Sequence, residues 1–362
     1  MQAQQLSSWT APILAFCLSL LLSVTLAPTL GLVTYQQYDF WLLWLVTMLI
    51  LALPFTLLEL ALAKRAKAAP LQAFLQLTRD ADRSTHWRLM SWAALVFVPF
   101  LVGSILHFAA EKVQISMGLG LDTSVLLLIL AIGGFALSML PRIALLAITA
   151  IATLIFAVLS MLQSTQSTWQ WTNIEFVEWA KVVTLTLVTG GLGLGLYWQN
   201  MIHAVKQKQS LTPLALPIWI AQALGLGSVM FVAQMQGATQ AILFLVAALG
   251  LAGLLLQFVR EQAIERGLPL LIQAVILLVP LLLWAIPQTS AIFYGLIIVY
   301  GLVLCLFNTI FVGWLMKISH LRKSLSFANE ATYNIWRVFI RIVMPLSIVV
   351  ALIGWLSVIT GA

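Results

Sequence analysis

The sequence predicts an all-α polytopic membrane protein of about eleven transmembrane helices, with the N-terminus inside and the C-terminus outside. Of its 362 residues, 62% are hydrophobic and only 8% are charged, whereas about a quarter of the residues in a soluble domain are charged. Apolar runs of membrane-spanning length follow one another with short connections. Residues 1–362 are therefore expected to form a single transmembrane domain whose main partner is the lipid bilayer.

Each predicted helix is an apolar run bounded by charged residues, proline or glycine. The runs lie at 10–34, 40–62, 88–110, 123–140, 143–162, 178–202, 213–235, 238–258, 268–286, 290–315 and 338–359. The stretch 123–162 is divided at Pro141–Arg142, because proline beside a basic residue predicts a turn. Two connecting segments, 71–79 and 318–325, carry an apolar stripe beside basic residues, which predicts short helices at the membrane surface.

The basic residues fix the predicted orientation. With the N-terminus inside, 16 of the 18 Lys and Arg residues lie on the cytoplasmic side, and only Lys112 and Lys181 lie outside. The net charge of +7 therefore reflects loop charge, and no nucleic-acid partner is expected. The short loops and the absence of N-x-S/T sites favour a bacterial inner membrane.

Signals for an enzyme, a cofactor or a metal are missing from the sequence. It contains no HExxH, no GxSxG, no Cys-x-x-Cys and no paired intramembrane carboxylates, and both Cys17 and Cys305 lie inside apolar runs. We therefore expect no catalytic residues, no cofactor and no metal site.

Two of the predicted helices contain helix-breaking residues. The first reads TLAPTLGL, with Pro28 and Gly31, and the sixth reads LVTGGLGLGLYW; its glycines are Gly190, Gly191, Gly193 and Gly195. Unwound segments expose backbone groups that lipid cannot satisfy, so they must face protein or a polar cavity. The alternative is an ordinary kink at Pro28 and a GxxxG packing face in the sixth helix.

The positions of these segments predict an inverted repeat. The chain divides into five helices (1–162), five more (163–316), and a cytoplasmic loop with an eleventh helix (317–362). In such a repeat, breaks in helices one and six meet near the bilayer midplane and form a substrate cavity.

Three segments resemble the neurotransmitter:sodium symporter family. They are LPFTLLELALAKRAKAAPLQAF in helix two and its exit, GGLGLGLYWQNMIHAVKQK in helix six, and ILFLVAALGLAGLLLQFVREQAIERG in helix eight. The resemblance implies a LeuT-like fold and secondary transport of a small organic solute of the amino acid or amine type. It also implies that Glu59 holds the unwound sixth helix; the alternative is a carboxylate at the interface, paired with a basic residue such as Lys64.

The sequence departs from that family where sodium and substrate would bind. Helix one lacks the Gly-Asn-x-Trp-Arg-Phe-Pro signature, and helix eight reads ALGLAGLL, without the hydroxyl ligands. Helix three shows Phe97, Pro99 and Phe100 in place of the substrate-binding Tyr. Sodium coupling is therefore doubtful, and proton coupling through Glu59 or His107, or uncoupled movement, fits the residues better. His107 and Glu111 share a helix face that suits a proton relay or a structural role.

The sequence thus predicts alternating access around the two breaks, with Glu59 and His107 in gating or coupling. The expected substrate-binding residues are Thr25, Pro28, Thr29, Gly31, Gly190, Gly191, Gly193, Gly195 and Tyr197. Other buried polar residues, among them Gln222 and Asn308, are expected to join helices. The alternative function is a transport-inactive scaffold or regulatory membrane protein that supports cell-envelope organisation or a protein partner complex.

Overall fold

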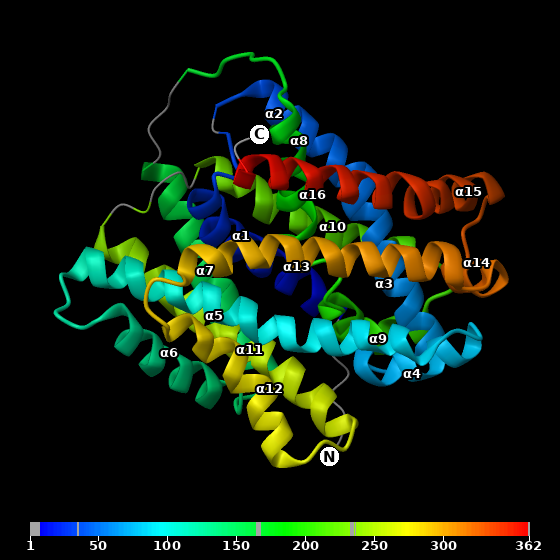
Figure 1. Ribbon diagram of the computed structural model, residues 1–362, viewed down its shortest axis with the longest axis horizontal. Coiled ribbons are helices and arrows are strands. Elements are labelled where there is room, and N and C mark those ends of the chain that lie inside the picture. Colours follow the sequence, from blue (N-terminus) through cyan, green and yellow to red (C-terminus); the bar gives the residue numbers. More distant parts are fainter. Residues whose placement is uncertain (1–7, 35, 164–167, 232–234, 236, 361–362) are drawn as a thin grey trace.

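The computed structural model describes residues 8–34, 36–163, 168–231, 235 and 237–360. Every regular element within these residues is a helix, and most of the long helices run along the same axis of the molecule (Figure 1). Eight of them are long and apolar enough to cross a membrane. The protein is therefore a multi-pass helical membrane protein.

The eight long spans follow the predicted runs closely, although several are joined from two helical pieces. They are α1 (Thr10–Leu30), α2 to α3 (Tyr38–Thr47 and Leu53–Ala66), α5 (Leu89–Met117), α7 (Arg142–Gln163), α10 (Thr212–Gly227), α11 (Ala238–Glu265), α13 (Ser290–Ile310) and α15 to α16 (Glu330–Val338 and Met344–Thr360). Turns of π-helix occupy Met48–Ala52, Phe311–Leu315 and Phe339–Val343. The last span begins at Glu330, earlier than predicted.

The remaining helices are shorter. Two are apolar, α6 (Thr123–Leu137) and α12 (Leu270–Leu282), and two form a discontinuous pair, α8 (Phe176–Leu187) and α9 (Leu196–Gln207). The predicted loop helices are confirmed as α4 (Pro70–Asp80) and α14 (Ile318–Leu325). Both lie on the right in Figure 1, at the end of the bundle that we call the basic end.

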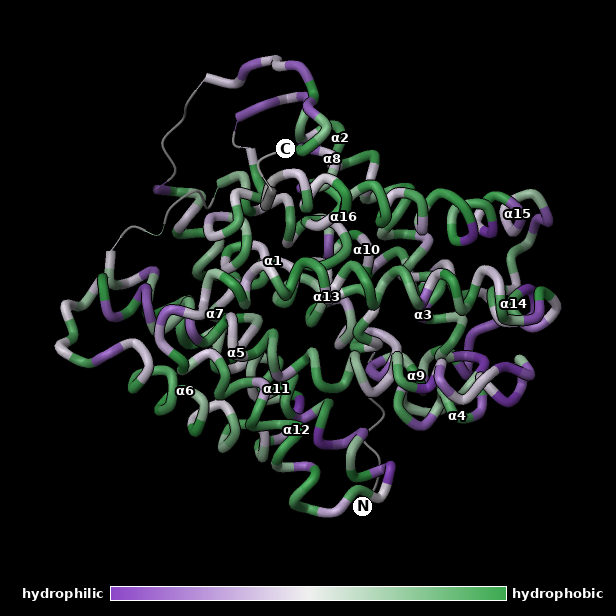
Figure 2. Tube along the Cα trace, in the orientation of Figure 1, coloured by the Kyte–Doolittle hydropathy of each residue, from purple (hydrophilic) through white to green (hydrophobic). Residues whose placement is uncertain are grey.

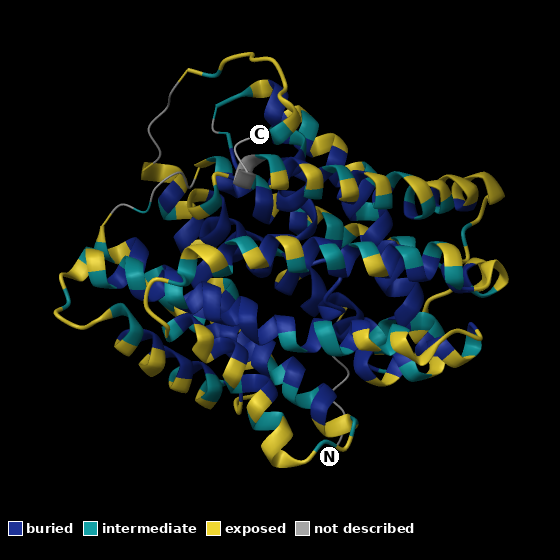
Figure 3. Cartoon of the chain, in the orientation of Figure 1, coloured by how far each residue is buried: buried dark blue, intermediate teal, exposed yellow. Residues whose placement is uncertain are grey.

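Apolar residues cover the outside of the bundle as well as its core. Ile132, Ile151 and Leu271 are 72%, 60% and 76% exposed, and hydrophobic segments line the outward faces of the helices (Figure 2). The buried residues fill the centre, where the long helices cross (Figure 3). An apolar exterior of this extent requires lipid around it.

The helix contacts fall into matching pairs. Helix α1 packs on α10, and α2 and α3 pack on α8 and α9. In the same way, α11 packs on α7 and α6, while α5 packs on α13 and α12. Small residues allow the close approaches: a Cβ at Gly250 of α11 would lie 2.4 Å from Thr149 Oγ1 of α7. The apolar ALGLAGLL segment of α11 therefore serves helix packing.

The predicted break in the first helix is wrong. Helix α1 continues through Pro28 to Leu30, and Gly31, with φ of 60°, ends it in the left-handed conformation. The N–H of Leu32 donates to Ala27 O at 3.0 Å, which completes a C-terminal cap. Pro28 lies in the last turn, so the donor that it lacks affects only the end of the helix.

The contact between α1 and α10 gives a stability prediction. A Cβ at Gly225 of α10 would lie 2.2 Å from Ser19 Oγ and 2.7 Å from the backbone O of Phe16. We expect Gly225→Ala to lower the free energy of unfolding by about 1–3 kcal/mol, because the two helices must separate. Thermal unfolding in detergent measures this. Gly295→Ala is the control, since nothing lies within 4 Å of its Cβ, and equal melting of both variants would contradict the prediction.

Candidate functional site

The chain leaves the helical conformation between α8 and α9, in the middle of the bundle. Residues 188–195 are all buried, and Gly191, Gly193 and Gly195 have φ of 66°, 83° and 71°. Glycine adopts this region without steric cost, whereas a side chain would be strained. The predicted break in the sixth helix is therefore confirmed, and Gly191, Gly193 and Gly195 lie in non-helical backbone rather than on a GxxxG face of a continuous helix.

Side chains of α9 and α10 satisfy one carbonyl of the break. Tyr197 Oη donates to Gly190 O at 2.6 Å, and Gln222 Nε2 donates to the same oxygen at 3.1 Å. Gln222 in turn accepts from Thr56 Oγ1 of α3 at 3.4 Å. Tyr197 thus lies at the break, as predicted, while Gln222 has a role there that the sequence did not identify.

Helix α13 satisfies two further carbonyls. Asn308 Nδ2 donates to Gly193 O at 3.3 Å, and Cys305 Sγ donates to Leu192 O at 3.3 Å. Both side chains are buried. A buried amide needs a partner in an apolar surrounding, so Asn308 in an apolar run was the available signal for this contact, whereas a buried cysteine packs as a small apolar residue and gives none.

Glu59 of α3 binds two backbone N–H groups of the break. Its Oε1 accepts from the N–H of Gly193 at 2.8 Å and from the N–H of Gly195 at 3.4 Å, and the residue is only 3% exposed. The alternative pairing is wrong, because Lys64 Nζ donates to Gln209 O at 2.5 Å. Glu59 therefore makes the contact that the resemblance implied, whereas its gating role stays a prediction.

The second oxygen of Glu59 has no partner among the described protein atoms. Oε2 is buried without a hydrogen bond, and Glu59 lines a cavity of about 10 Å³ together with Ser91, Trp198 and Asn308. A volume of this size holds about one water molecule. In this conformation the cavity is too small for an amino acid.

Helix α1 meets the break at Leu18 rather than at Pro28. A Cβ at Gly191 would lie 2.4 Å from Leu18 Cδ2, and Leu18 is fully buried. Pro28 follows ten residues later, which is about 15 Å along a helix. The expected grouping of the two helix-breaking segments is therefore not found, and an apolar side chain of a continuous helix covers the break.

The other site residues predicted in the first helix are turned to their own backbone. Thr25 Oγ1 donates to Leu21 O, and Thr29 Oγ1 donates to Thr25 O, both at 2.8 Å. Thr25 is buried, whereas Pro28, Thr29 and Gly31 are exposed at the end of α1. The structure does not bring this group to the glycines of the sixth helix.

His107 also lies away from the break. It follows Ala94, which lines the Glu59 cavity, by 13 residues of α5, or about 20 Å of helix. Its ring is 5.6 Å from that of Trp284 and 6.3 Å from that of Tyr294, measured between centroids. His107 and Glu59 are therefore separate groups, without direct contact for proton exchange.

A polar network joins four helices just below the break, at the basic end. Glu261 of α11 pairs with Arg142 of α7 and accepts from Gln199 Nε2 of α9 at 3.1 Å. Gln262 Nε2 donates to Gln199 Oε1 at 2.9 Å, and its own Oε1 accepts from the N–H of Leu71 in α4 at 3.1 Å. This network ties α9, the helix that follows the break, to α4, α7 and α11.

Together, these observations describe a multi-pass helical membrane protein with a buried helix break at its centre. No family model matches the sequence, and no curated protein matches it either. Among solved structures, the chain is similar to MhsT, whose crystal structure was determined in complex with L-phenylalanine. The TM-score is 0.67 at 14% identity, over 95% of this chain and 98% of MhsT. The LeuT-like fold is thus confirmed.

The Glu59 contacts lead to a second stability prediction. Leu at position 59 leaves the N–H groups of Gly193 and Gly195 without their acceptor, and each unsatisfied buried group costs about 1–3 kcal/mol. The Glu59→Gln variant keeps a side-chain oxygen that can accept from these N–H groups. We expect the free energy of unfolding of Glu59→Leu, measured by chemical denaturation, to be at least about 2 kcal/mol lower than that of Glu59→Gln. Equal stability of the two variants would show that the Glu59 acceptor contributes nothing.

Proposed function

We propose that the protein is a secondary transporter that moves a small organic solute of the amino acid or amine type by alternating access. The observation that carries this proposal is the buried break between α8 and α9, held by Glu59. A continuous helix would satisfy its own backbone groups, whereas this break needs side chains from four helices. Buried backbone that departs from regular structure at such a cost is typical of functional sites.

The architecture proposed for this function is five helices, an inverted five and one more, with residues 1–162 and 163–316 as the repeats. The paired helix contacts support it, because each contact of the first set has a counterpart in the second. Eleven spans result if α6, α12 and the α8–α9 pair are added to the eight long spans. The basic loops support an N-terminus inside, in a bacterial inner membrane.

Glu59 is the group that we propose to couple the break to transport. It is buried, and it contacts the amides of the break directly. In a proton-coupled or uncoupled cycle, a change in these hydrogen bonds would let the break change shape as the cavity opens. Sodium has less support, because the ALGLAGLL segment of α11 carries no side-chain oxygen.

Uptake into proteoliposomes tests the proposal. The panel contains amino acids and amines, with sodium and proton gradients imposed separately. We expect uptake of at least one solute, and at least about tenfold slower turnover for Glu59→Gln, since about 1.4 kcal/mol in one step changes a rate tenfold. Glu330→Gln is the control, because Glu330 pairs with Arg322 on the surface. No uptake across the panel would contradict transport.

A second function has one specific observation in its favour. Helix α1 is continuous, and Leu18 fills the place beside Gly191 where a solute would meet the break. Hydroxyl groups of α1 near the break bond to their own helix, as Ser23 does to Ser19 O at 2.6 Å. A transport-inactive scaffold or regulatory protein that supports the cell envelope or a partner complex is consistent with this filled centre.

Leu18→Ala distinguishes the two functions. In an inactive scaffold, the lost side chain leaves a cavity beside Gly191 and costs about 2–5 kcal/mol. Added amino acids and amines would then stabilise the Leu18→Ala variant in a thermal shift assay but not the wild type. Leu14→Ala, one turn away and equally buried, serves as the control for packing loss. Stabilisation of the wild-type protein by a panel solute would exclude the filled-centre function.

A further inference from the structure

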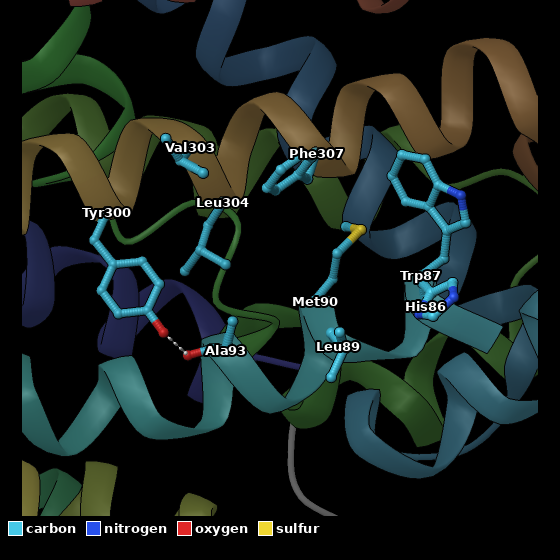
Figure 4. Close-up of a pocket in the computed structure, with 9 residues that line it drawn as sticks. All are labelled: His86, Trp87, Leu89, Met90, Ala93, Tyr300, Val303, Leu304 and Phe307. Carbon is cyan, nitrogen blue, oxygen red and sulfur yellow. Dashed lines mark hydrogen bonds between the residues drawn. The ribbon is translucent and has the colours of Figure 1, made fainter. Parts of the chain in front are cut away.

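An apolar groove of about 320 Å³ opens between α5 and α13, and Met90 lines both this groove and the small Glu59 cavity at the α8–α9 break. Figure 4 shows side chains of the two helices turned toward one another across it. It is lined by His86, Trp87, Leu89, Met90, Ala93, Tyr300, Val303, Leu304 and Phe307. Leu89 and Phe307 are 64% and 41% exposed, so the groove is open along the apolar outside of the bundle.

The length of the groove offers no polar group to an occupant. Its one hydroxyl is engaged, because Tyr300 Oη donates to Ala93 O at 2.9 Å (Figure 4). The other side chains between these two residues are apolar, and His86 lies at the opposite end, in the short 3₁₀ turn Thr85–Arg88 that precedes α5. An occupant must therefore be apolar along most of its length and polar only at the His86 end.

The His86 end of the groove is basic. Arg83 and Arg88 lie within three residues of His86 in the chain, and Arg83 is exposed. Trp87 contacts Phe311 in a tilted arrangement, with ring centroids 5.8 Å apart, which brings the end of α13 to the same place. Exposed Lys317 follows there. Of the two nearby carboxylates, Asp80 is neutralised by Arg65 at 2.7 Å, and Asp82 remains.

We propose that this groove binds an anionic phospholipid from the leaflet at the basic end. One acyl chain lies between α5 and α13, and the phosphate lies beside Arg83 and Arg88. The proposal rests on the order of groups along the groove: apolar surface at membrane depth, then an aromatic Trp87, then basic side chains at the surface. Basic pockets between transmembrane helices bind anionic headgroups in this arrangement, and the aromatic residue occupies the interface level.

Native mass spectrometry of the purified protein in mild detergent tests the proposal, with phosphatidylglycerol and acyl-matched phosphatidylethanolamine titrated separately. Val303→Trp fills the groove, and Leu296→Trp is its control, an exposed residue of the same helix outside the groove. Arg83→Gln removes one headgroup charge, and Lys208→Gln is the matched control on another loop of the basic end. Leu89→Trp fills the groove from an exposed position, should Val303→Trp fail to fold.

We expect the wild type to bind phosphatidylglycerol more tightly than phosphatidylethanolamine. In Val303→Trp and in Leu89→Trp, the lipid that the wild type binds most tightly should be lost. Arg83→Gln should bind phosphatidylglycerol about fivefold more weakly, the effect of one basic residue near an anionic surface. The controls should bind as the wild type does. Equal lipid binding by the groove variants and Leu296→Trp would overturn the site, and equal affinity for the two lipids would overturn its anionic character.

Discussion

The need to satisfy a stretch of buried, non-helical backbone is the constraint on which the centre of this protein depends. The break between α8 and α9 is buried in the centre of the bundle, where lipid cannot supply hydrogen bonds and the adjoining cavity has room for about one water molecule. Its groups are bonded instead by side chains from four helices, namely Glu59, Tyr197, Gln222 and Asn308. Because each bond is directional, it sets the depth and rotation of the helix that supplies it.

The two halves of the bundle treat this constraint differently. The half that contains α8 and α9 has a break, whereas helix α1 is continuous, and Thr25 bonds to its own helix. Leu18 of α1 therefore presents an apolar side chain to the break at Gly191. The basic-end network of Arg142, Glu261, Gln199 and Gln262 restrains α9 directly below that point.

Local signals were sufficient for the helices, but they could not distinguish a break from a helix end. Pro28 and Gly31 are helix-breaking residues, as are the glycines at 190–195. Pro28 and Gly31 nevertheless lie at the end of α1, whereas the glycines at 190–195 are buried in the centre of the bundle. Where a residue lies relative to the centre depends on which helix it faces. Gln222 and Asn308 were interpreted as packing residues for the same reason, since their partners are 32 and 115 residues away in the chain.

The sequence by itself determined that the chain is a multi-pass helical membrane protein, where its long spans and loop helices lie, and that the sixth predicted helix carries helix-breaking glycines. These properties follow from hydrophobic length, charge and glycine content, which act within one segment. Tertiary structure decided that the glycines interrupt the sixth helix, that α1 is continuous, that Leu18 covers Gly191, and that His107 lies away from the break. Those facts depend on contacts between distant segments, which no local pattern encodes.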